Sequence, residues 1–377
     1  MATTVSNRAA LESINHLMAV DRLPISIVLM VTSVVGVSSN IIIVFVYMSR
    51  MPNWRASGRF FVPFLAINDA IVCITGPVFR VYLNFNFIVR KSDVICQSGA
   101  YFINVFVAVS SMILLLITID RFLFVYYSGS KPFALKFKWM SLIGILLIAF
   151  ISQTPIWIFI GELEVKSVEH RKHSLGNMSF YQCSEIHGDK YEKSAIIHTA
   201  LRIGFVFCQV IIMAVLYSLI ARVIYRGLTR IRKTRTTPSN SSSKLSPDPD
   251  SRSAESDTYT PPKKEMSKTR ERLNTMLKKT VSRQNLYGHF SRHRFTYTFM
   301  LLTGIYAINL IPSTVITLLS MVLGEHTFWY RLTYAELSVS LLAYNSDIID
   351  SAIHPFIYGL LDTKLRSEIK RILKCWK

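Results

Sequence analysis

The sequence predicts an all-α membrane protein, a bundle of seven transmembrane helices followed by a short amphipathic eighth helix. Hydrophobic residues make up 51% of its 377 positions, and the mean hydropathy is positive. The apolar residues form long blocks instead of the short alternating runs that are typical of a soluble domain. Most of the basic residues lie between these blocks on one side of the predicted membrane.

Seven apolar blocks are long enough to cross a bilayer, which requires about 20 residues in a helix. Four contain no ionised side chain: Pro24–Met48, Ile95–Ile119, Trp139–Ile160 and Phe295–Gly324. Three others contain few: Phe60–Phe79, Ser194–Ala221 and Leu337–Leu361. We expect the helical bundle to cover residues 24–361.

The distribution of charge predicts the orientation in the membrane. Most of the 43 lysines and arginines face the cytoplasm if residues 1–23 are extracellular, as the positive-inside rule requires. We therefore expect a multi-pass protein of the plasma membrane. The net charge of +20 lies in loops, so it indicates contact with anionic membrane lipids and not a nucleic-acid partner.

Two cytoplasmic segments have distinct compositions. Residues 222–294 are basic and rich in Ser, Thr and Pro, which predicts a long disordered third loop with helical extensions of the neighbouring spans at its ends. Residues 362–377 place Leu365, Ile369 and Ile372 on one helical face and basic residues on the other. This pattern predicts an amphipathic helix on the membrane surface, followed by a short tail.

The cysteines and the loop before the fifth span suggest covalent features. Cys96 opens the third span and Cys183 lies in this loop, both on the oxidising side, so they can pair. The stretch around Cys183 predicts a short hairpin, and Asn177 begins a glycosylation pattern. Cys375 follows the amphipathic helix and is a candidate for palmitoylation, with an unmodified thiol as the alternative.

Ionisable residues within the predicted spans are functional candidates, because they are costly in a bilayer, although a role in helix packing is the alternative. The Asp69 carboxylate, with Asn40 placed to hydrogen-bond it, suits a small hard cation. A second hypothesis is that His354 pairs with an aspartate and makes the protein pH-sensitive. The pocket expected for an allosteric Na⁺ at Asp69 consists of Asn40, Asp69, Ser110, Asp350, Ser351 and His354.

Several motifs occur in register on these spans. They are Asn40, Asp69, the cysteines Cys96 and Cys183, the triplet Asp120-Arg121-Phe122, Tyr217, Pro312, and the segment DSAIHPFIY with Pro355 and Tyr358. With these motifs the chain resembles a rhodopsin-family (class A) G-protein-coupled receptor over almost its whole length. Within that family it is most similar to invertebrate-type neuropeptide or orphan receptors.

The resemblance implies a signalling mechanism and its partners. Asp120 restrains Arg121 at rest, and Arg121 is released toward a heterotrimeric G protein when the sixth helix swings out at Pro312. Receptor kinases and arrestin are the other expected partners, and no cofactor beyond the possible Na⁺ is implied. The residues expected to carry activation are Asp120, Arg121, Tyr217, Pro312, Pro355 and Tyr358.

The sequence departs from the family pattern at several positions. Gly144 or Ile145 stands near the expected fourth-helix tryptophan, and Gln209 occupies the place of the fifth-helix proline. Asn309-Leu310-Ile311-Pro312 replaces the usual C-W-x-P, and Ser111 and Tyr306 replace an apolar packing pair. Asp350 and His354 also replace two asparagines.

The ligand is restricted by what the third and seventh spans lack. The third span has no carboxylate at the position of Ile103, which argues against a biogenic amine, and the seventh has no lysine for retinal. The expected pocket is polar and suits a peptide whose acidic group contacts Arg202, unless Arg202 pairs with Asp347. Its residues are Ile103, Asn104, Arg202, Asn309, Ser313, Thr314, Thr317 and Asp347.

These patterns predict a receptor and not an enzyme, because no nucleophile, base and oxyanion donor occur together. Two alternatives stay open, a chemosensory receptor for small molecules and a non-signalling heptahelical decoy. We expect regulatory phosphorylation in the third loop, since the tail offers only Thr363 and Ser367. The candidate sites in the loop are Ser251, Ser253, Ser256 and Thr258.

Overall fold

The computed structural model describes residues 12–13, 15–51, 54–55, 59–86, 93–127, 134–166, 169–170, 173–174, 179–185, 192–233, 296–323, 328–329 and 331–375. The chain divides into one unit of Met1–Ile220 with Thr296–Lys377 and a second unit of Ala221–Phe295. In the second unit, the described part is the helical stretch 221–233. Residues 222–233, predicted as a helical extension of the fifth span at the start of the third loop, form the end of a long helix.

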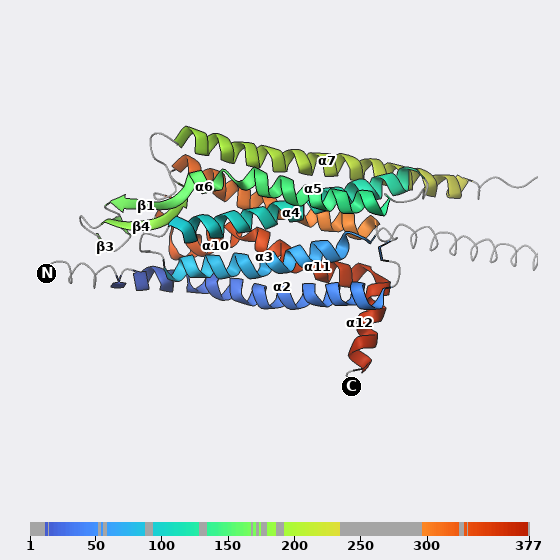
Figure 1. Ribbon diagram of the computed structural model, residues 1–377, viewed down its shortest axis with the longest axis horizontal. Helices are drawn as coiled ribbons and strands as arrows, with labels where there is room; N and C mark the ends of the chain where they lie inside the picture. Colours follow the sequence, from blue (N-terminus) through green and yellow to red (C-terminus); the bar gives the residue numbers. More distant parts are fainter. Residues whose placement is uncertain are drawn as a thin grey trace, which may run out of the picture. The chain divides into compact units, whose positions relative to one another are not determined.

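Six helices in the described part of the chain are long and apolar enough to cross a membrane. They are α2 (Leu23–Arg50), α3 (Val62–Phe85), α4 (Asp93–Tyr126), α5 (Leu135–Gln153) with the short α6 (Ile156–Phe159), α7 (Glu192–Lys233) and the helix Thr296–Leu323. Within the first unit, α2 packs against α3, α3 against α4, and α4 against α5 (Figure 1).

The seventh span, predicted at Leu337–Leu361, is divided into two helices. Helix α10 (Tyr334–Tyr344) begins with a capping box, in which Thr333 and Glu336 satisfy each other's backbone N–H groups. Helix α11 (Ser346–Leu361) follows after Asn345, whose backbone leaves the helical region. The Ser346 hydroxyl donates a hydrogen bond of 2.8 Å to the carbonyl of Asn309, which anchors the break to the neighbouring helix.

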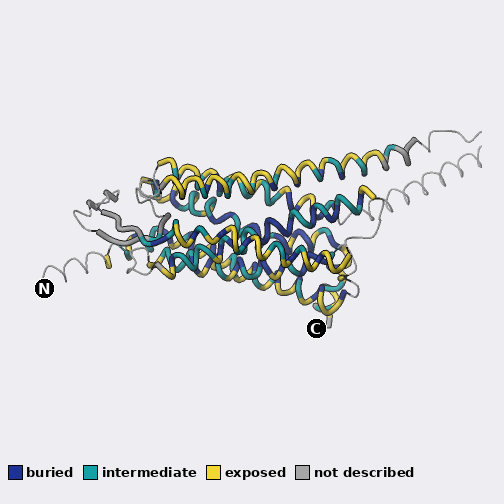
Figure 2. The backbone as a smooth tube through the Cα atoms, turned by 45° about the horizontal axis from the view of Figure 1, so that its top comes forward, coloured by how far each residue is buried: buried dark blue, intermediate teal, exposed yellow. Residues whose placement is uncertain are grey.

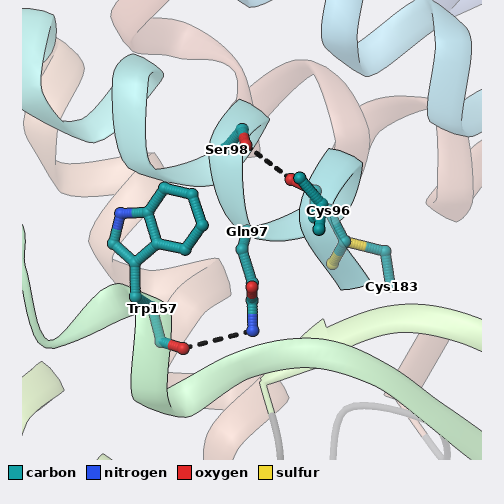
Figure 3. Close-up of a disulfide and its surroundings, with 6 residues drawn as sticks. Cys96, Gln97, Ser98, Trp157 and Cys183 are labelled. Atoms are coloured by element: carbon teal, nitrogen blue, oxygen red, sulfur yellow. Dashed lines mark hydrogen bonds between the residues drawn. A yellow bond between two sulfur atoms is a disulfide. The ribbon is translucent and has the colours of Figure 1, made fainter. Parts of the chain in front are cut away.

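The predicted hairpin before the fifth span is confirmed. Strand β1 (Ile160–Lys166) pairs antiparallel with β4 (Ser179–Glu185), in a register that places Glu162 opposite Cys183. A second pair joins β2 (Glu169–His170) and β3 (His173–Ser174). A disulfide between Cys183 and Cys96 ties the hairpin to α4, and Gln97 donates a hydrogen bond of 3.1 Å to the carbonyl of Trp157 beside it (Figure 3).

Apolar side chains lie both between the helices and on their outer sides. Leu29 and Val46 of α2 are fully buried, whereas Val31 and Val34 of the same helix are more than half exposed. Figure 2 shows buried residues gathered where helices meet and exposed residues on the outward sides. Large exposed apolar surfaces are unfavourable in water, so these outer sides are suited to contact with lipid.

Helix α12 (Thr363–Cys375) follows α11 and has the predicted amphipathic pattern. Leu365 is buried, while Lys370 and Arg371 are exposed. Asp362 caps the helix by accepting hydrogen bonds from the backbone of its first turn, and it also pairs with Arg59 at 3.1 Å. The direction of α12 is thus fixed to the segment between α2 and α3.

Candidate functional site

A buried cluster of charged side chains lies in the middle of the helix bundle. The Nδ1 atom of His354 lies 2.7 Å from Oδ2 of Asp69, and its Nε2 atom lies 3.2 Å from Oδ2 of Asp350. Ser110 donates a hydrogen bond of 2.8 Å to the other oxygen of Asp69. The side-chain amide of Asn309 donates one of 2.9 Å to Asp350. The cluster therefore joins α3, α4, α11 and the helix Thr296–Leu323.

The asparagines near this cluster have roles that differ from our expectation. Asn40 donates hydrogen bonds to the carbonyls of Gly36 and Ser351, so it links α2 to α11 and does not bind Asp69. The sequence analysis missed Asn68, which donates to the Ser110 hydroxyl at 2.7 Å. Asn68 precedes Asp69 directly, and only the packing of α3 on α4 shows that both residues face inward.

The arrangement does not fit the sodium site that we expected at Asp69. One carboxylate oxygen of Asp69 accepts from Ser110 and the other faces the His354 ring nitrogen. Among the described residues, no group of three or more His, Cys, Asp or Glu side chains is arranged to hold a metal ion. The ring of His354 thus lies where an ion would have to approach the carboxylate.

A cavity of about 560 Å³ lies above this cluster, on the side of the β1–β4 hairpin. Seven residues predicted for the ligand pocket line it: Asn104, Arg202, Asn309, Ser313, Thr314, Thr317 and Asp347. Ile103 is buried and does not line the cavity, so its assignment to the pocket is wrong. Neighbouring residues of a helix point about 100° apart, and α4 turns Asn104 toward the cavity instead.

Two arginines of the cavity wall were missed because they lie just outside the predicted spans. Arg22 precedes the first span, and Arg80 follows the last residue predicted for the second. The Arg80 guanidinium lies 4.5 Å from the centre of the Tyr344 ring and interacts electrostatically with Asp347. Asp347 is thus under the electrostatic influence of Arg80, and the pairing of Arg202 with Asp347 that we considered is not observed in the described part of the chain.

The floor of the cavity is continuous with the charged cluster. Ser110 and Asp350 line the cavity, and both are direct members of the cluster through their contacts with Asp69 and His354. Asn309 also has both positions, because it lines the cavity and donates to Asp350. A molecule that reaches the floor therefore contacts the network without any intermediate layer.

The opposite end of the bundle contains the Asp-Arg pair. Asp120 and Arg121 are both buried, and their side chains form a salt bridge with each other. The sequence analysis missed Lys138, which is fully buried on α5 with its ammonium 5.4 Å from the centre of the Phe60 ring. Lys138 also interacts electrostatically with the pair, attracted by Asp120 and repelled by Arg121.

Both predicted tyrosines are buried, and Tyr217 lies near this pair. The Tyr217 hydroxyl accepts hydrogen bonds from Thr118 at 3.3 Å and Thr303 at 3.4 Å, which joins α4, α7 and the helix Thr296–Leu323. Tyr358 is buried with its ring 5.9 Å from that of Phe299. Pro355 is inside α11, and Pro312 is inside the helix that starts at Thr296.

Some predicted sites lie outside the described residues. They are the glycosylation site Asn177, the side chain of Cys375 and the phosphorylation candidates Ser251, Ser253, Ser256 and Thr258.

Fold and site together define a seven-helix membrane receptor, with a polar cavity at one end and a buried Asp-Arg pair at the other. The family model described as "7 transmembrane receptor (rhodopsin family)" matches residues 39–358. A crystal structure of squid rhodopsin matches with a TM-score of 0.59 and 14% identity, over 97% of this chain and 88% of that chain, which shows a shared fold. The protein belongs to the rhodopsin family of seven-transmembrane receptors.

Proposed function

We propose that this receptor transmits an extracellular peptide signal to heterotrimeric G proteins, with its N-terminus outside the cell. The buried salt bridge between Asp120 and Arg121 carries this proposal. The Arg121 guanidinium is held by the Asp120 carboxylate at rest. A buried ion pair separates only when another acceptor replaces the lost partner, so Arg121 can donate to a second acceptor when one is supplied. A G protein that binds between the helix ends would supply that acceptor.

Tyr217 supports the same mechanism. Its hydroxyl accepts from Thr118, which lies three positions before Arg121 on α4, and from Thr303 on the helix that contains Pro312. Both contacts are long, at 3.3 and 3.4 Å, and an outward movement of that helix would break the second. The tyrosine would then be available to hold the released Arg121.

The cavity supports a peptide ligand. Three of its lining residues have a buried side-chain atom without a hydrogen-bond partner among the described residues: Oε1 of Gln153, Nε2 of His198 and Oδ1 of Asn345. These atoms can accept hydrogen bonds, and buried acceptors without a donor are unfavourable. A peptide supplies amide N–H donors for such atoms, and an acidic group on it would match the Arg202 guanidinium.

Regulation would follow from the same assignment. We extend the proposal to receptor kinases and arrestin acting on the third loop, to palmitoylation at Cys375 and to contact of α12 with membrane lipids.

The test is a calcium or cyclic-AMP readout in cells that display the receptor, challenged with a fractionated peptide extract before and after protease treatment. We expect a protease-sensitive response that is lost in Arg121→Ala and kept in Arg331→Ala, which changes an exposed arginine at the cavity end. A protease-resistant response would replace the peptide with a small molecule. Silence despite display at the cell surface would favour a non-signalling decoy.

A further inference from the structure

His354 faces two carboxylates at once inside the bundle. Its two ring nitrogens lie 2.7 Å from Asp69 and 3.2 Å from Asp350, and all three side chains are buried. A neutral imidazole has a single N–H group, so it can donate to only one of these oxygens. The imidazolium donates from Nδ1 to Asp69 and forms an ion pair with Asp350 through Nε2, which places one positive charge between the two negative charges.

Asp69 and Asp350 thus form a cation site in which the His354 side chain takes the place of the cation. A free ion at Asp69 would need several oxygen ligands, and the carboxylate oxygens are already engaged by Ser110 and His354. Displacing the ring would leave Asp350 buried, with the Asn309 amide as its hydrogen-bond donor and no nearby cation among the described contacts. Removing one partner from a buried ion pair leaves an uncompensated buried charge and is strongly destabilising. The ring is therefore a strong competitor for any ion.

We propose that His354 is a tethered cation that takes the place of a bound sodium ion, and that the conformational equilibrium of this receptor does not respond to sodium. A covalently held charge cannot dissociate, so its occupancy is independent of the ion concentration outside the cell. The inference rests on the geometry of the cluster, and its stability test needs neither a ligand nor a G protein.

The tethered charge also assigns a function to Asp350. The aspartate lines the ligand cavity, and it contacts both His354 and Asn309. A ligand that draws Asn309 away from Asp350 leaves that carboxylate to His354, which strengthens the contact within α11 and weakens the contact with the helix Thr296–Leu323. The cluster then transmits the state of the cavity floor to the helix that moves, with no ion as an intermediate.

The experiment measures the thermal unfolding of the purified full-length receptor in sodium chloride and in choline chloride at equal ionic strength. We expect the same Tm for the wild type in both salts. In His354→Asn the two aspartates lose their shared cation and an oxygen ligand is added, so we expect a higher Tm in sodium than in choline. The double variant His354→Asn, Asp69→Asn should lose that difference.

Two further variants keep the experiment decisive. His354→Lys retains a tethered cation and should remain indifferent to sodium, which separates the charge from the shape of the side chain. His16→Asn changes an exposed histidine outside both the cluster and the cavity and should behave as the wild type. A sodium-dependent Tm of the wild type that disappears in Asp69→Asn would overturn the proposal, and so would a His354→Asn receptor that folds but ignores sodium.

A second readout is basal nucleotide exchange on G proteins in membranes, and this part rests on the proposed function. The wild type should show equal basal exchange in the two salts, whereas His354→Asn should show less exchange in sodium. If no exchange occurs in any variant while the Tm pattern holds, the G-protein assignment fails and the tethered cation stands.

Discussion

Replacing Lys138 by methionine should lower the ligand-independent activity of the receptor. The Lys138 ammonium is attracted by Asp120 and repelled by Arg121, so the two interactions partly cancel while the salt bridge is intact. When Arg121 leaves Asp120, the repulsion disappears and the attraction remains. Lys138 therefore favours the state in which the salt bridge is open, and its loss favours the closed state.

The expected size follows from the burial of these groups. Unit charges roughly 5–10 Å apart interact by about 2–3 kcal/mol at an effective dielectric of about 20. Methionine keeps the contact with the rings of Phe60 and Phe61, which lie 5.4 and 6.0 Å from the ammonium, so the change removes mainly the charge. We expect basal activity to fall about 10-fold or more, since about 1.4 kcal/mol corresponds to a factor of 10.

The assay is basal nucleotide exchange on a panel of G proteins, normalised to receptor at the membrane surface. Lys136→Met is the matched control, because Lys136 is exposed on the same helix and should leave basal exchange unchanged. Lys138→Arg keeps the charge and should retain most of the activity. Basal exchange that stays constant or rises in Lys138→Met would refute the sign of this argument.

Three further changes test the packing and the helix ends. A Cβ atom at Gly99 would clash with the Phe79 ring, so Gly99→Ala should reduce the free energy of unfolding by about 1–3 kcal/mol and lower the Tm. Gly144→Ala is the control, because a Cβ atom there would have no atom within 4 Å, and its Tm should not change. Asp362→Ala removes the cap of α12 and should speed hydrogen exchange there; unchanged rates would contradict the capping role. Thr333→Ala removes the capping box of α10 and should destabilise the receptor by about 1 kcal/mol in chemical unfolding, an effect that an unaltered midpoint would disprove.

The sequence predicted the features that depend on one helix at a time. Apolar blocks located the spans, because the length of a bilayer crossing is set by its thickness and the rise of the helix. The hairpin around Cys183 and the amphipathic α12 also follow from local pattern and spacing. Each of these is a property of a short segment and its immediate chemistry.

The sequence could not predict features that depend on how the helices rotate against each other. Ile103 and Asn104 are adjacent, and only the orientation of α4 decides which one faces the cavity. Lys138 lies at the edge of a predicted span, where a charge is expected to be exposed in a loop. Its burial depends on the rings of Phe60 and Phe61, which directly precede α3. Asn345 gave no sign of a helix break, because the hydrogen bond from Ser346 to the carbonyl of Asn309 is a tertiary contact.

The break at Asn345 and the cluster at His354 act on the same neighbouring helix. The carbonyl of Asn309 accepts from Ser346 at the break, and its side chain donates to Asp350 one turn further along α11. Asn309 is therefore held at both its backbone and its side chain, three residues before Pro312, where the missing backbone N–H weakens the helix. Movement of this helix away from α11 must break both contacts together. The cavity is lined by Asn309, Ser346 and Asp350, so a ligand that replaces these hydrogen bonds with its own lowers the cost of the movement at the position where the helix bends most easily.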